Sequence, residues 1–313
     1  MNGLELSRAF YEAHGRPMLE QQFPALLPLL AVGLFGSGSE CFGYDDPVSR
    51  DHDFEPGFCL FLPGEDRVDR RQEFLLERAY AKLPKSFEGF SRSVLLPVGG
   101  ARHGVLRTGE FFARTVGAPD GRLSLDQWLS VPEQALAEAT NGALFFDALG
   151  EVTEIRARLG YFPEDVRLKR LAGHLLLMAQ AGPYNYPRCL RHGEPAAAQL
   201  AAVSFVESAM ACIFLLNRRY RPYYKWSFRA LRALPVLGEL AGPLEWLLTT
   251  GNDARTAAEK TAQIEAISAA VLSLAREQEL VLPGVDDLER QAYAVNDRIR
   301  DAGLRNRHIL AAV

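Results

Sequence analysis

The sequence predicts an α+β protein, with a small mixed sheet and its helices in residues 1–160 and an all-α helical bundle in residues 161–313. Short apolar runs bounded by glycine and proline, which are typical of buried strands, become rare after residue 160. Beyond that point apolar residues recur with helical periodicity over long segments. A chain of 313 residues also predicts two domains, at roughly 150 residues each.

Strand and helix patterns interleave within residues 1–160. Pro56 and Gly57 should interrupt the second strand or place it at a sheet edge. Ser124 is the expected N-cap of the last helical stretch, in which Pro132 begins a second segment. We expect strands over 28–35, 52–62, 94–98, 105–108 and 143–147, and helices over 4–20, 66–83 and 124–140.

Residues 161–313 are dominated by helical patterns whose starts or boundaries are marked by prolines. The Ala-rich stretches 196–212 and 256–271 are typical of helices that pack closely within a bundle. The same surfaces could pack against a second copy, so a homodimer stays open. We expect helices over 163–181, 194–219, 223–233, 238–249, 252–280 and 284–303.

The composition is that of a globular protein, with 48% hydrophobic and 24% charged residues. A net charge of -4 argues against a long nucleic acid as partner. Four cysteines without a CxxC pair indicate reduced thiols. The longest apolar run, residues 23–35, is broken by Pro24 and Pro28 and is too short to span a bilayer. We therefore expect a cytoplasmic protein with no membrane partner.

One segment has a pattern that favours phosphate chemistry. The apolar run 28–35 is followed by the turn Gly36-Ser37-Gly38-Ser39, and the next predicted strand begins with Asp51-His52-Asp53. Because strand residues alternate faces, Asp51 and Asp53 share one face about 6–7 Å apart, where two carboxylates can hold Mg²⁺ jointly. The small turn lets backbone N–H groups approach a phosphate. Together these features predict a nucleoside-triphosphate site.

A second segment, residues 217–232, combines basic and aromatic residues and contains no acid. One interpretation is a phosphate clamp, in which Lys225 or Arg221 binds phosphates and Tyr224 stacks on a base. A single-stranded nucleic-acid platform is the second interpretation. The third is a helix with packed aromatics and solvated arginines. Lys225 is the first choice for a phosphate ligand because Pro222 starts a new element just before it.

The pattern Phe35-Gly36-Ser37 followed by Asp51-His52-Asp53-Phe54 resembles the signature of the polymerase-β-type nucleotidyltransferase superfamily. The whole chain also resembles an uncharacterised bacterial family that carries GSGSE and SRDHD, followed by a helical region with a stretch like LLNRRYRPYYKW, here residues 215–226. The architecture is similar to that of antibiotic nucleotidyltransferases, whose small catalytic domain precedes a helical bundle.

The resemblance implies transfer of a nucleoside monophosphate from an NTP, with ATP expected, to a hydroxyl of a small molecule, a protein or an RNA end. Pyrophosphate would leave, and two Mg²⁺ ions would be held by Asp51 and Asp53. Relatives add a third carboxylate on a later strand, for which Asp147 is the best candidate and Glu110 a weaker one. A lysine from the helical domain often reaches the triphosphate, which favours Lys225.

Residues 105–107 contain no acid where some relatives carry one. This departure keeps an alternative open, in which the chain is a non-catalytic nucleotide-binding or antitoxin-like regulatory module.

Overall fold

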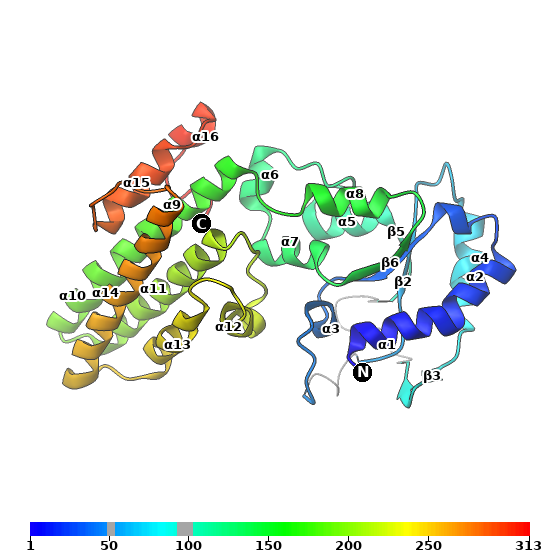
Figure 1. The fold of residues 1–313 in the computed structure, drawn as a ribbon, viewed down its shortest axis with the longest axis horizontal. Helices are drawn as coiled ribbons and strands as arrows, with labels where there is room; N and C mark the ends of the chain where they lie inside the picture. Colours follow the sequence, from blue (N-terminus) through cyan, green and yellow to red (C-terminus); the bar gives the residue numbers. More distant parts are fainter. Residues whose placement is uncertain (49–53, 93–102) are drawn as a thin grey trace. The chain divides into compact units, whose positions relative to one another are not determined.

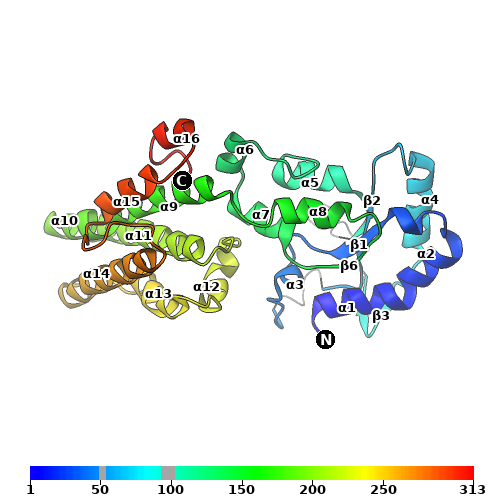
Figure 2. The ribbon, with the colours of Figure 1, turned by 45° about the horizontal axis from the view of Figure 1, so that its top comes forward.

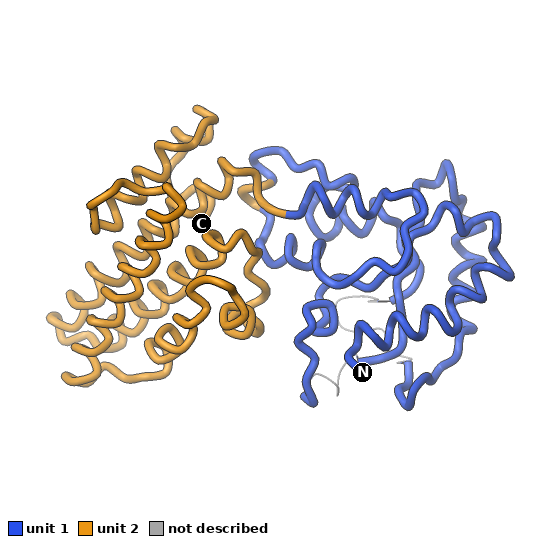
Figure 3. Tube along the Cα trace, viewed as in Figure 1, with its two compact units in different colours: residues 1–127, 131–160 blue, residues 128–130, 161–313 orange. Residues whose placement is uncertain are grey.

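A computed structural model describes residues 1–48, 54–92 and 103–313 (Figure 1). The predicted strand over 94–98 and the Asp51-His52-Asp53 motif lie outside these described residues. The chain forms two compact units (Figure 3). Unit 1 comprises residues 1–127 and 131–160, and unit 2 comprises residues 128–130 and 161–313. The fold class is α+β, as the sequence predicts.

Within the described residues, unit 1 contains a four-stranded mixed sheet in the order β5-β2-β1-β6. Strand β1 pairs antiparallel with both β2 and β6, and β2 pairs parallel with β5. Pro28 lies in the 3-10 turn Leu27–Leu29, so β1 begins later than predicted. The bounds are β1 Ala31–Leu34, β2 Cys59–Leu62, β5 Gly104–Arg107 and β6 Ala143–Asp147, and a separate hairpin joins β3 Ser86–Phe87 to β4 Phe90–Ser91.

Helices cover both faces of this sheet (Figure 2). Val32 and Leu60 share a buried cluster with residues of α1, α2 and α4. On the other face Phe61 meets Phe111 of α5, with ring centroids 5.5 Å apart. Helices α5 and α8 were not predicted from the sequence. The bounds are α1 Gly3–Phe10, α2 Arg16–Gln22, α3 Ser39–Phe42, α4 Arg70–Ala81, α5 Thr108–Val116, α6 Leu125–Ser130, α7 Glu133–Thr140 and α8 Glu151–Arg158, with a π-helical turn at Tyr11–Gly15.

Unit 2 is helical throughout its regular structure, as predicted, and α11 contacts α9, α10, α13 and α14. By length and composition α11 could cross a membrane, but 67% of its apolar window is buried, as in the core helix of a bundle. The predicted helix 284–303 is divided between α15 and α16. The bounds are α9 Glu164–Ala179, α10 Tyr186–Arg191, α11 Pro195–Leu216, α12 Tyr224–Arg232, α13 Ala241–Thr249, α14 Ala254–Glu277, α15 Leu288–Asp297 and α16 Ala302–Asn306.

Candidate functional site

The Gly36-Ser37-Gly38 turn follows β1 directly. Phe35 anchors its start, because its ring stacks on that of Phe61 with centroids 4.7 Å apart. Gly36 has a φ of +133°, a conformation that side-chain-bearing residues rarely adopt. A Cβ at Gly38 would lie 2.0 Å from Oε1 of the buried Glu40. The turn therefore favours glycine at position 36 through its backbone conformation, whereas a side chain at position 38 would require the Glu40 carboxylate to move.

Asn141, which no pattern in the sequence singles out, holds this turn in place. Its Nδ2 donates to the carbonyl oxygen of Gly36 at 2.7 Å, and its Oδ1 accepts from the Gly36 N–H at 2.9 Å. Arg156 in turn donates to the carbonyl oxygens of Thr140, at 2.7 Å, and Asn141. The Arg156 guanidinium lies 4.6 Å from the centre of the Phe35 ring. Burial of the guanidinium lowers the pKa of Arg156.

The hydrogen bonds of Asn141 change which groups of the turn are available to a ligand. The Gly36 N–H is already donated, so it does not offer a phosphate contact. Ser37 is exposed, and within the described part of the chain its N–H and Oγ have no hydrogen-bond partner. Ser37 therefore presents two donors outward.

The metal-ligand candidates Asp51 and Asp53 lie outside the described residues. Among the residues that the structure describes, no group of three or more His, Cys, Asp or Glu side chains could hold a metal ion.

Asp147 lies at the opposite end of the sheet from the turn. It pairs with Ala31 at the start of β1, whereas Ala143 pairs with Leu34, the residue nearest the turn. At the rise of a strand, their β1 partners Ala31 and Leu34 are about 10 Å apart. The Asp147 carboxylate accepts hydrogen bonds from the N–H and Oγ of Thr153 at 2.8 and 2.7 Å. The structure thus gives Asp147 a helix-capping role and does not bring it beside Gly36 and Ser37.

The weaker candidate Glu110 lies on α5. Its side chain is 68% exposed, and its Oε1 is 3.5 Å from Nη2 of Arg70. On β5, the strand parallel to β2, the buried Arg107 pairs with Glu73 at 2.7 Å. Among the described residues, the strand beside β2 therefore offers a structural arginine and no carboxylate.

A pocket of about 560 Å³ lies at the same end of the sheet as Asp147. Burial, and then the nearby Asp147 carboxylate, raise the pKa of Glu151 there. A wall with three acids and one arginine is poorly suited to a triphosphate. The pocket is lined by Pro63, Gly64, Asp66, Arg67, Leu149, Glu151 and Glu154.

The basic and aromatic segment of unit 2 forms the loop before α12 and α12 itself. Lys225 lies in the first turn of this helix, with Nζ 4.9 Å from the centre of the Trp226 ring. Within the described residues Lys225 has no carboxylate partner. Tyr224 is 76% exposed, and its ring centroid is 4.2 Å from that of Tyr223. These side chains present a cation and an aromatic ring to solvent.

Arg221, unlike Lys225, is held by a hydrogen bond to the backbone. Its Nη1 donates to the carbonyl oxygen of Glu207 at 3.3 Å. Burial, with the charges of Arg221 and Arg170, lowers the pKa of His174 to about 3. Arg221 therefore bonds to α11 and lies close enough to His174 of α9 to affect its charge, unlike the exposed Lys225.

A family model described as a domain of unknown function (DUF4037) matches residues 128–227. The matched stretch runs from the end of α6 into α12 and includes Arg221, Tyr224 and Lys225. No curated protein matches the chain.

Proposed function

We propose that the chain is a Mg²⁺-dependent nucleotidyltransferase, which moves a nucleoside monophosphate from an NTP, with ATP expected, to a hydroxyl acceptor. The observation that carries this proposal is the turn after β1. Gly36 adopts a backbone conformation that favours glycine, and Ser37 presents an N–H and a hydroxyl without partners in the described chain. Such donors suit phosphate oxygens. Asp51 and Asp53 follow in the sequence at a spacing similar to that of the nucleotidyltransferase superfamily.

The donor chemistry fits magnesium. Asp51 and Asp53 supply carboxylate oxygens and Ser37 a hydroxyl, which are the hard ligands that Mg²⁺ prefers. When bound, the metal neutralises phosphate charge and lowers the pKa of an acceptor hydroxyl. Ser37 would orient a phosphate through its N–H. The acceptor oxygen then attacks the α-phosphorus, the bond to the β-phosphate oxygen breaks, pyrophosphate leaves and the hydroxyl proton passes to solvent.

In unit 2 we assign phosphate binding to Lys225 and base stacking to Tyr224. A positive charge at a helix N-terminus is electrostatically unfavourable, because the helix dipole favours anions there. Lys225 occupies this position in α12 without a carboxylate partner among the described residues. A bound anion would remove the conflict. Arg221 adds positive charge nearby in the sequence, although its guanidinium also bonds Glu207.

A second candidate function is a regulatory module that binds a nucleotide without transferring it. The placement of Asp147 at the far end of the sheet favours this reading, as does Arg107 on β5. Within the described residues, neither supplies a third carboxylate near the turn. Nucleotide binding without pyrophosphate release would support it.

The test measures pyrophosphate release and protein mass with each NTP and Mg²⁺. The variants are Asp51→Ala/Asp53→Ala and, as a matched control, Asp147→Asn, which retains an oxygen for Thr153. Metal-dependent turnover that the double variant loses and Asp147→Asn keeps would support the transferase. Binding without turnover would support the regulatory module, and absence of both would exclude both proposals.

A further inference from the structure

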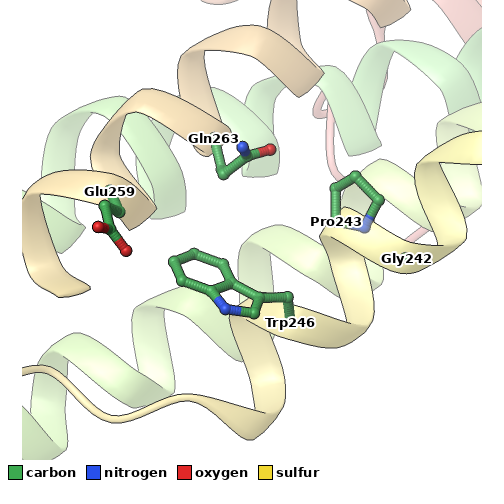
Figure 4. A pocket seen from close by; sticks show the side chains of 5 residues that line it. All are labelled: Gly242, Pro243, Trp246, Glu259 and Gln263. Carbon is green, nitrogen blue, oxygen red and sulfur yellow. The ribbon is translucent and has the colours of Figure 1, made fainter.

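Unit 2 contains a pocket of about 390 Å³ between α13 and α14 (Figure 4). This volume lies within the range of small-molecule sites. The Trp246 ring extends from α13 toward α14, and Glu259 and Gln263 project from successive turns of α14. The pocket is lined by Gly242, Pro243, Trp246, Glu259 and Gln263.

A buried network fixes the two walls of the pocket. Lys260 follows Glu259 in the chain but is fully buried. Its Nζ donates to the carbonyl oxygen of Thr250 at 2.6 Å and to Asn252 Oδ1 at 3.1 Å, in the segment that follows α13. A third bond, of 2.8 Å, reaches Gln199 Oε1 on α11. Because Lys260 joins α14 to the end of α13, the pocket is formed before any ligand binds.

The lining combines an aromatic face with oxygen acceptors. Trp246 is half-buried, and the Glu259 side chain is 47% exposed. Within the described part of the chain, the Gln263 amide has no hydrogen-bond partner. An organic cation is attracted to the face of an indole ring, and the N–H groups of an ammonium or guanidinium cation form strong hydrogen bonds with a carboxylate. We propose that this pocket binds a small organic cation that carries N–H donors, as an ammonium or guanidinium group does.

The chain already places a guanidinium on this carboxylate. Arg255 Nε lies 3.1 Å from Glu259 Oε1, and the Arg255 side chain is 88% exposed. Exposed pairs of this spacing on a helix contribute little to stability, so a ligand can displace Arg255 from Glu259 at small cost. An uncharged ring stacked on Trp246 would instead cover the carboxylate without compensating its charge.

The test compares butylguanidinium with butylurea, which has a similar shape but no charge, by calorimetric titration of the full chain. We expect butylguanidinium to saturate one site and to bind at least about tenfold more tightly than butylurea. Trp246→Leu and Glu259→Gln should each weaken binding by about tenfold. Glu245→Gln removes the same charge one residue from Trp246 but outside the lining, and should leave affinity within about twofold.

A second variant distinguishes ligand binding from a structural role of Glu259. Arg255→Ala removes the competing guanidinium, so it should tighten butylguanidinium binding at least about twofold. Unchanged or weaker binding in this variant would overturn the proposal. Equal affinity for butylurea, insensitivity to Glu259→Gln, or no saturable binding up to about 10 mM would also overturn it.

Discussion

The side-chain amide of Asn141 exchanges two hydrogen bonds with the backbone of Gly36, one through Nδ2 and one through Oδ1. This exchange reproduces, with a side chain, the paired bonds of an antiparallel ladder. It continues the pairing of β1 with β6 beyond Leu34 and Ala143. The direction in which the chain leaves β1 is thereby fixed, and Ser37 becomes the first residue with donors to offer.

Replacement of Asn141 by alanine should therefore lower the free energy of unfolding. Asn141→Ala leaves the N–H and carbonyl oxygen of Gly36 without these partners in a part-buried site, which costs about 1–3 kcal/mol. Urea unfolding measures the loss. Asn306→Ala, at an exposed position of α16, should change stability by less than about 0.5 kcal/mol. Equal effects of the two substitutions would contradict the role given to Asn141.

The backbone conformation of Gly36 gives a separate prediction. A Cβ at Gly36 or at Gly43 would meet no atom within 4 Å, so space does not limit either substitution. The φ of Gly43 is +69°, in the left-handed region that alanine can reach at a cost of about 1–2 kcal/mol. The φ of Gly36 is +133°, which is harder for alanine to adopt. Gly36→Ala should thus lower the thermal unfolding midpoint more than Gly43→Ala, and the reverse order would refute this assignment.

Much of the fold could be predicted because periodic patterns are local. The strands at 105–108 and 143–147 match β5 and β6 to within a residue, and the helical character of unit 2 is also correct. Helix α5 was missed although its buried residues Thr108, Phe111, Phe112 and Val116 recur at helical spacing, and only Gly109 near its start weakens the local helix propensity. The division between α15 and α16 depends on tertiary contacts, since Asp165 of α9 accepts from the N–H groups of Arg300 and Asp301.

The candidate site was less predictable because its support comes from distant parts of the chain. Gly36 and Asn141 are separated by 105 residues, and no local pattern connects them. The Asn141-Gly142 pair signals only a turn in sequence. The position of Asp147 depends on strand register, because an acid at the end of β6 reaches the turn only if β6 runs parallel to β1. Single-sequence reasoning does not establish that direction.

We expect Lys225 to contribute to nucleotide binding and to lower the free energy of unfolding slightly. Lys225→Met removes a positive charge from the first turn of α12, so the free energy of unfolding should stay constant or rise by up to about 1 kcal/mol. The apparent dissociation constant for Mg-ATP should rise about tenfold with loss of one phosphate contact. Lys82→Met, at an exposed position after α4, should alter neither quantity. An unchanged dissociation constant in Lys225→Met would leave this lysine without its assigned role.

Acid should destabilise unit 2 through His174 of α9. Its Nδ1 is buried without a partner among the described residues, and burial, Arg221 and Arg170 lower its pKa to about 3. The imidazole of His174 takes up a proton near pH 6.5 in the unfolded chain but not in the folded chain. The stability that depends on neutral His174 is therefore fully present above pH 6.5 and is lost as the pH falls from 6.5 toward 3. Between pH 7 and pH 5 the loss should be about 2 kcal/mol.

Urea unfolding of His174→Asn at both pH values separates this effect from other acid-sensitive groups. The variant has no imidazole to protonate, so its free energy of unfolding should fall by about 2 kcal/mol less than that of the wild type. His192→Asn removes a histidine at an exposed position after α10. This variant should lose as much stability between pH 7 and pH 5 as the wild type does. A histidine that is buried and neutral in the folded protein takes up a proton on unfolding at pH 5. If His174→Asn and the wild type lose the same stability between pH 7 and pH 5, the acid sensitivity therefore does not come from His174.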